Sequence, residues 1–231
     1  MKSLFLVAAL AAAADAHYIF NILFVNGQRQ GGEYSYVRKN SNAYNPVFPD
    51  ILDKNDLRCN VGAKAGNTAT YTVKAGDKIG FKVFNNELIE HPGPGFVYMS
   101  KAPSDVKSYD GSGDWFKVME TGLCRGQANT DGNWCSYNKD RLEFTIPAKT
   151  PPGEYLVRVE HIGLHEGHVN KAQFYMTCAQ FKIEGPGGGN PGPMVKIPGL
   201  YQKTHPGIAY NKWTSNPAPY QMPGPKVWDG N

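Results

Sequence analysis

Cysteine is scarce in this 231-residue chain, and the spacings typical of metal-binding cysteines are absent. Of its four cysteines, no two form the CxxC pattern of zinc sites. The sequence has no Asn-x-Ser/Thr acceptor, so N-glycosylation is not expected. Its net charge of +4 is not gathered into a basic run, and no capped segment has helical periodicity. These absences argue against a zinc module, a nucleic-acid partner and a helical fold.

The first sixteen residues have the pattern of a secretory signal peptide. Lys2 precedes an apolar run that ends at Ala14, and Ala14-Asp15-Ala16 is a small-x-small cleavage site. The run is shorter than the about 20 apolar residues that a transmembrane helix needs. Cleavage after Ala16 would make His17 the first mature residue, whereas the competing cleavage after Ala14 would leave Asp15 first. We therefore expect a secreted, extracellular protein with no membrane segment, whose cysteines form disulfides.

Short runs with period-two alternation dominate the rest of the chain. They occur at Tyr18–Val25, Thr70–Val73, Ile79–Phe84, Leu142–Ile146, Tyr155–His161 and Gln173–Ile183. Turn-forming clusters of Asn, Asp, Gly and Pro separate them. The pattern predicts an all-β fold, an antiparallel immunoglobulin-like or fibronectin-like β-sandwich. The intervals Gln28–Asn67 and Met99–Asp140 are too long for simple connections, so we expect functional or disulfide-stapled loops there.

The C-terminal region predicts an arm and not a second domain. Residues 185–193, GPGGGNPGP, have the composition of a flexible linker. The 38 residues from Met194 to Asn231 contain no cysteine and are too few for an unstapled domain, yet they carry several aromatic rings. We therefore predict a signal peptide at 1–16 and one β-sandwich domain at 17–231, monomeric, with an extended arm from about 185 to 231.

His17 would offer two nitrogen donors at the mature N-terminus, its α-amine and its ring, which can chelate one metal ion. Both must be deprotonated, and their ordinary pKa values of about 7.7 to 8.0 and about 6.5 let a metal displace the protons near neutral pH. A third nitrogen would complete a planar site, and all-nitrogen tetragonal geometry favours Cu(II). The alternative is a histidine that follows a signal peptide by chance.

Four other residues are candidates for the same site. His91 precedes Pro-Gly-Pro-Gly, a sequence that favours extended backbone and close approach of a ligand, although a surface-loop histidine is the competing interpretation. The strand period places Gln173 and Tyr175 on one face. Tyr175 could stand axial to a copper plane while Gln173 donates to a bound oxygen species, or it could be a half-buried tyrosine with a satisfied hydroxyl. His165 could support the site or be a loop histidine.

Together these motifs resemble the fungal lytic polysaccharide monooxygenases of auxiliary activity family nine, formerly classified among the glycoside hydrolases. The resemblance covers almost the whole mature chain. It rests on the start His17-Tyr18, on His91-Pro92-Gly93-Pro94 followed by Val97-Tyr98-Met99-Ser100, on Gly163-Leu164-His165, on Ala172-Gln173-Phe174-Tyr175 and on Pro198-Gly199-Leu200-Tyr201.

The resemblance implies a copper-dependent polysaccharide monooxygenase with one copper per chain. It would cleave cellulose or a related β-1,4-glucan oxidatively at C1 and/or C4, with O2 or H2O2 as co-substrate and an external reductant as electron donor. The resemblance assigns His17, His91 and Tyr175 as metal ligands, the two histidines forming the histidine brace. It assigns His165 and Gln173 to the binding and activation of the oxygen co-substrate.

The resemblance also implies a substrate surface and a disulfide. Aromatic rings that lie parallel to sugar rings would be Tyr44 and Tyr201. Cys59 would pair with Cys178. Cys124 and Cys135 remain for a second disulfide, which departs from the family pattern.

Two other functions are compatible with parts of the sequence. One is a glycoside hydrolase with paired carboxylates, but no motif singles out such a pair. The other is a non-catalytic copper- or carbohydrate-binding sandwich, against which the joint presence of His165, Gln173 and Tyr175 weighs. The choice between C1 and C4 attack depends on loop geometry around the axial position, and the choice between cellulose and hemicellulose depends on the flat substrate face. The sequence specifies neither.

Overall fold

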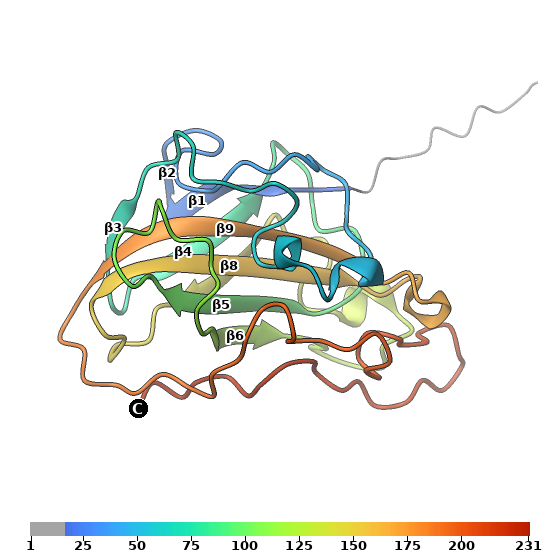
Figure 1. The fold of residues 1–231 in the computed structure, drawn as a ribbon. Coiled ribbons are helices and arrows are strands. Elements are labelled where there is room, and N and C mark those ends of the chain that lie inside the picture. The colour runs from blue at the N-terminus through green and yellow to red at the C-terminus, as the bar shows by residue number, and fades with distance from the viewer. Residues whose placement is uncertain (1–16) are drawn as a thin grey trace, which may run out of the picture.

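Two packed β-sheets form the framework of residues 17–231, the part of the chain that the computed structural model describes (Figure 1). The predicted signal peptide lies outside the described residues. The four-stranded sheet has the order β2 (Gln28–Gln30), β1 (Phe20–Val25), β4 (Lys78–Val83), β7 (Arg141–Thr145). The five-stranded sheet has the order β3 (Tyr71–Lys74), β9 (Gln173–Glu184), β8 (Gly153–Gly163), β5 (Gly95–Lys101), β6 (Phe116–Thr121).

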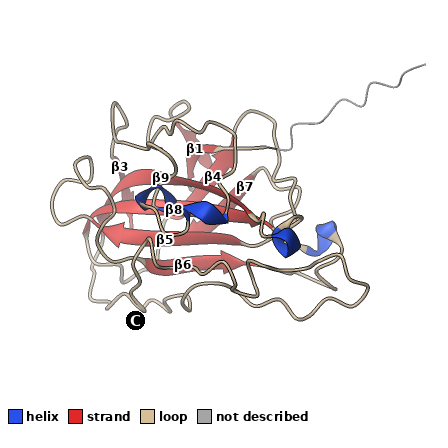
Figure 2. Cartoon of the chain, turned by 45° about the vertical axis from the view of Figure 1, so that its right-hand side comes forward, coloured by secondary structure: helices blue, strands red, loops and turns tan. Residues whose placement is uncertain are grey.

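The structure confirms the predicted β-sandwich. Neighbouring strands are antiparallel except for β3 and β9, which pair in parallel. Helical structure within residues 17–231 consists of single 3-10 turns, η1 to η4, and the cartoon is otherwise strand and loop (Figure 2). The turns lie at Pro49–Ile51, Asn55–Leu57, Asp131–Asn133 and Gly167–Val169. Over the described range, no helix has the length and apolar character needed to cross a membrane.

Apolar clusters cover both faces of the five-stranded sheet. Val157 and Val159 of β8 belong to the cluster between the sheets, together with Phe20 and Phe81 of the other sheet. Leu156, the residue directly before Val157, belongs to a second cluster under the long loops and the C-terminal arm. The five-stranded sheet is therefore a buried central layer. Close packing on both faces makes its strands rigid, so side chains at the strand ends are held in fixed positions.

This two-sided burial explains which strands the sequence reveals. The six segments predicted as strands correspond to β1, β3, β4, β7, β8 and β9. β5 is missed because its residues from Gly95 to Ser100 are all buried, so the period-two alternation is lost. β6 lies inside Met99–Asp140, which the sequence predicts as a loop, and β2 lies inside Gln28–Asn67.

Residues 185–231 form an extended arm with no strand. The arm runs beside the five-stranded sheet and turns back, so that the C-terminus lies near its beginning (Figure 1). Trp115 and Val195 form an isolated antiparallel bridge on the outward leg. On the return, the Asn190 N–H donates to the Asn231 carbonyl oxygen at 3.1 Å.

Candidate metal centre

Strand pairing brings the predicted site residues together at one end of the five-stranded sheet. The register of β8 and β9 places His161 opposite Tyr175. His17 lies just before β1, and His91 lies in the turn before β5. The ring centroids of His17 and His91 are 6.5 Å apart. The Tyr175 ring lies 6.4 Å from that of His17 and 5.8 Å from that of His91. We call the group His17, His91, His165, Gln173 and Tyr175 the metal corner.

The turn that carries His91 is held against the end of β8. The Leu164 N–H donates to the Pro92 carbonyl oxygen at 2.9 Å. A Cβ atom added at Gly93 would lie 1.8 Å from the Ile162 carbonyl oxygen, so only glycine allows this approach. The glycine-rich sequence after His91 thus fixes the position of the His91 backbone.

His91 and His165 form a stacked pair. Their ring centroids lie 4.1 Å apart with an interplanar angle of 23°. A Cβ atom at Gly163 would come within 3.1 Å of the His91 Cβ and 3.5 Å of the His165 ring, so the glycine leaves room for the stack. Burial, followed by the charges of His165 and His17, lowers the pKa of His91 to about 3. His91 is therefore a neutral imidazole, the form that ligates a metal.

Tyr175 is held as a buried, protonated phenol. It is 2% exposed, and burial raises the pKa of its hydroxyl. That hydroxyl donates to the Gln173 Oε1 at 2.6 Å, so the two side chains share a face as the strand period predicts. The Tyr18 ring stacks on the Tyr175 ring at 4.1 Å. Because the Gln173 oxygen accepts from Tyr175, its amide NH2 group remains available as a donor.

A buried hydrogen-bonded chain lies beneath Tyr175. The Tyr18 hydroxyl lies 2.6 Å from Nδ1 of His161, and Nε2 of His161 lies 3.3 Å from the Ser136 Oγ. The Ser136 hydroxyl donates onward to the Gly93 carbonyl oxygen at 2.6 Å. Burial is the main cause that lowers the pKa of His161 to about 3. His161 is therefore neutral, accepts from Tyr18 and donates to Ser136, which is a supporting role that the sequence did not indicate.

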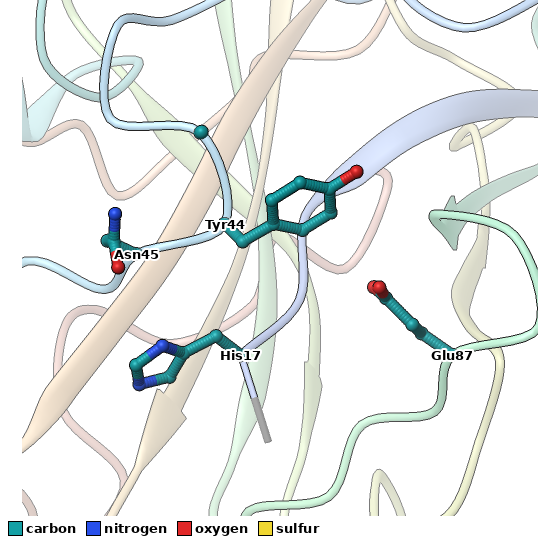
Figure 3. Close-up of a pocket in the computed structure, with 5 residues that line it drawn as sticks. His17, Tyr44, Asn45 and Glu87 are labelled. Carbon is teal, nitrogen blue, oxygen red and sulfur yellow. The ribbon is translucent and has the colours of Figure 1, made fainter. Parts of the chain in front are cut away.

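A shallow cavity of about 410 Å³ opens beside His17 (Figure 3). Tyr44, Asn45 and Glu87 line it, and the carboxyl group of Glu87 points toward Tyr44. The Tyr44 ring packs edge-on against Phe84 at 5.5 Å. The predicted substrate residue Tyr44 thus lies beside His17 at the surface.

Tyr201 occupies a different environment. It is 6% exposed, and its hydroxyl donates to the Glu160 Oε2 at 2.6 Å. Glu160 in turn pairs with the fully buried Arg158 at 2.6 Å. The Tyr201 hydroxyl is therefore committed to an internal network and is not available to a sugar. The assignment of Tyr201 to the substrate surface stays a prediction. Its support is that Tyr201 lines a surface pocket together with Pro198.

Two disulfides are present. Cys59 pairs with Cys178, as the resemblance implies, and fastens the loop after β2 to β9. Cys124 pairs with Cys135 and closes a short loop after β6.

Comparison with known proteins finds a matching family. The sequence profile of Auxiliary Activity family 9 (formerly GH61) matches residues 17–220. The chain is 47% identical to AA9 family lytic polysaccharide monooxygenase G of Aspergillus tamarii over 100% of this chain and 71% of that protein.

Solved structures share the fold. The extended catalytic domain of H. jecorina LPMO9A superposes with a TM-score of 0.83 at 28% identity, covering 93% of this chain and 92% of that one. A cellulose-active polysaccharide monooxygenase from M. thermophila gives a TM-score of 0.79 at 30% identity, covering 93% and 100%.

The chain belongs to auxiliary activity family 9. The family resemblance seen in the sequence is confirmed, and so is the prediction that this protein is a copper-dependent polysaccharide monooxygenase. The whole of the matched range lies within the described residues.

The residues of this AA9 enzyme fit a copper ion. Nε2 of His91 is buried and has no hydrogen-bond partner in the described chain. A metal would satisfy such an unpaired ring nitrogen of a neutral histidine, and the ring of His17 lies 6.5 Å from that of His91. No group of three or more His, Cys, Asp or Glu side chains that could hold a metal occurs within residues 17–231. The third nitrogen that the sequence predicts is the α-amine of His17, a main-chain group that lies outside this set of side chains.

One exposed aromatic residue of the AA9 enzyme is not distinguished as a surface residue by its sequence. Trp213 is 59% exposed, the most exposed of the large apolar side chains described. Its indole Nε1–H donates to the His165 carbonyl oxygen at 2.7 Å, which ties the ring to the metal corner. The only signal in the sequence was an aromatic residue in the arm, which predicts packing as readily as exposure. We call Tyr44 and Trp213 the aromatic rim.

Proposed function

We propose that this enzyme binds one copper ion through the ring and α-amine of His17 and the ring of His91. The orphaned, neutral His91 nitrogen beside His17 is the observation that carries this assignment. The α-amine of His17 becomes available if the signal peptide is removed after Ala16. Because such a peptide directs export, we also propose that the enzyme is a secreted, extracellular protein. Tyr175, a protonated phenol whose ring lies 6.4 Å from that of His17 and 5.8 Å from that of His91, would be a further, weak ligand of the copper.

We propose that Gln173 and His165 serve the oxygen co-substrate. Gln173 keeps an amide donor because its oxygen is occupied by Tyr175. His165 is stacked on His91, and its Nδ1 is buried without a hydrogen-bond partner in the described chain. When bound, copper would supply the one-electron chemistry by which an external reductant and O2 or H2O2 remove hydrogen from a glycosidic carbon.

Cellulose is the proposed polymer, attacked at C1 and/or C4 by a monomeric enzyme. The exposed Trp213 ring beside His165, with Tyr44 beside His17, supplies aromatic surface at the metal corner against which sugar rings can lie. The similarity to a cellulose-active enzyme from M. thermophila supports the same polymer.

Product analysis tests the proposal. Copper-loaded protein that begins at His17 is incubated with phosphoric-acid-swollen cellulose and ascorbate, and the soluble products are identified by mass spectrometry. We expect aldonic acids for C1 attack, 4-keto sugars for C4 attack, and no oxidised products from protein stripped of copper. Neutral oligosaccharides alone would indicate a hydrolase, whereas stoichiometric copper uptake without oxidised products would indicate a binding protein.

A further inference from the structure

The residue next to Trp213 is a buried cation. Lys212 has no exposed surface, yet its ammonium group lies 2.8 Å from the Asp131 carboxylate. The same ammonium lies 3.8 Å from the centroid of the Trp213 ring, within the range of a cation–π interaction. A buried lysine is costly unless it is paired, so this contact set is a built feature of the fold.

Asp131 belongs to the loop that Cys124 and Cys135 close. The loop is also tied internally, because the Cys124 N–H donates to the Asn133 carbonyl oxygen at 2.8 Å. The indole N–H of Trp134 donates to the Ala128 carbonyl oxygen at 3.1 Å. The loop is therefore a compact unit that can hold a neighbouring segment in place.

The same loop holds the chain that follows Trp213. The Asn129 side-chain amide donates to the carbonyl oxygen of Thr214 at 3.2 Å, and the Gln127 amide donates to the Asn216 side chain at 3.3 Å. The loop therefore contacts the arm on both sides of Trp213 in the sequence. It contacts Lys212 before the tryptophan, and Thr214 and Asn216 after it. Because residues 185–231 include no named strand, these contacts take the place of strand hydrogen bonds around Trp213.

We infer that the disulfide-closed loop 124–135 positions Trp213 for the polysaccharide, with Asp131 and Lys212 as positioning residues. The inference rests on the proposed role of Trp213 in binding the polymer. The Lys212 ammonium covers one face of the indole, and the Nε1–H bond to His165 fixes its edge, so the opposite face is presented to a sugar ring. Holding the ring in its bound orientation strengthens binding because less side-chain freedom is lost in the complex.

Binding to phosphoric-acid-swollen cellulose without reductant tests this inference. Lys212→Met keeps the apolar stem and removes the ammonium. In the copper-loaded enzyme we expect this change to weaken binding about five- to tenfold, while copper affinity and the thermal midpoint stay near those of the wild type. The matched control is Lys78→Met, which removes a 2.7 Å ion pair with Glu143 on the four-stranded sheet and should leave binding unchanged.

A second readout reports the position of the ring itself. The indole N–H signal of Trp213 in a 15N-labelled sample, assigned with Trp213→Phe, should shift or broaden in Lys212→Met while the other tryptophan signals stay in place. If Lys212→Met does not fold, the double variant Cys124→Ser/Cys135→Ser replaces it and should give the same loss of binding.

The outcomes separate this inference from the proposed function. If Trp213→Ala binds cellulose poorly but Lys212→Met binds as the wild type does with an unchanged indole signal, the positioning role is wrong and the aromatic rim stands. If Trp213→Ala itself binds as tightly as the wild type, the proposed polymer-binding role of Trp213 fails, and this inference fails with it.

Discussion

The metal corner and the aromatic rim are adjacent but are built in different ways. His91 and Tyr175 lie at a turn and on a strand, and backbone hydrogen bonds with a glycine-only approach at Gly93 hold that turn. Trp213 lies on an arm without strands, and side-chain contacts hold it. Metal ligation needs fixed nitrogen positions, whereas a flat polymer needs exposed rings. The sheet and its end turns can therefore fix the metal ligands, whereas an exposed ring needs side-chain contacts of its own at the surface.

Removing a ligand from the metal corner should have the largest effect. His91→Ala deletes the orphaned nitrogen, so we expect loss of tight copper binding and of oxidised products together. Copper titration by calorimetry and product analysis measure the two effects. The matched control is His168→Ala, because His168 is exposed on η4. Oxidised products from a His91→Ala variant at normal copper occupancy would refute the ligand assignment.

The two disulfides should differ in the property that they control. Cys59→Ala/Cys178→Ala removes the disulfide between residues 119 positions apart in the sequence. For a closed loop of this length, the chain-entropy model gives a loss of about 4 to 5 kcal/mol in the free energy of unfolding. Cys124–Cys135, with a separation of 11, should contribute about 3 kcal/mol at most but should affect cellulose binding more. Urea unfolding and binding isotherms of both double variants test this contrast. Equal loss of cellulose binding in the two variants would contradict it.

Removing the exposed ring should affect the polymer alone. Trp213→Ala is expected to weaken binding to swollen cellulose by about tenfold or more, because a large aromatic contact is lost. Copper affinity should remain that of the wild type, since the indole contacts the backbone oxygen of His165 and not a metal ligand's ring. A parallel loss of copper would show that the corner and the rim are not independent.

The sequence reveals the metal corner better than the aromatic rim for a physical reason. Period-two alternation predicts that Gln173 and Tyr175 lie on one face of the strand, and the hydrogen bond between their side chains confirms this. β5 is missed because both of its faces are buried. Trp213 lies where no periodic pattern exists, so nothing in the sequence distinguishes exposure from packing. Tyr201, assigned to the surface by resemblance, is 6% exposed because its hydroxyl satisfies an internal carboxylate.

A change outside both regions should alter stability alone. Arg141 first and Lys82 next hold the pKa of Asp140 at about 2, below its ordinary value. A lowered carboxyl pKa stabilises the fold above the unfolded pKa of about 3.9, and this contribution is lost as the pH falls toward 2. Because the Asp140 side chain is 35% exposed, we expect Asp140→Asn to cost about 1 kcal/mol at pH 6 and less at pH 3.

Urea unfolding at the two pH values measures this effect. Copper and cellulose affinities should not change, which makes Asp140→Asn the reference for effects on folding alone. A cost that grows as the pH falls would show that the pairing with Arg141 and Lys82 is not its source.

The central claim is that the α-amine of His17 acts as a copper ligand together with the two rings. The most direct test compares protein that begins at His17 with protein that carries one additional glycine before it, both titrated with Cu(II) and observed by electron paramagnetic resonance. The added residue keeps both imidazoles but converts the amine into an amide. We predict a loss of copper affinity of several orders of magnitude and a changed spectrum. Equal affinity and an identical spectrum would contradict the account.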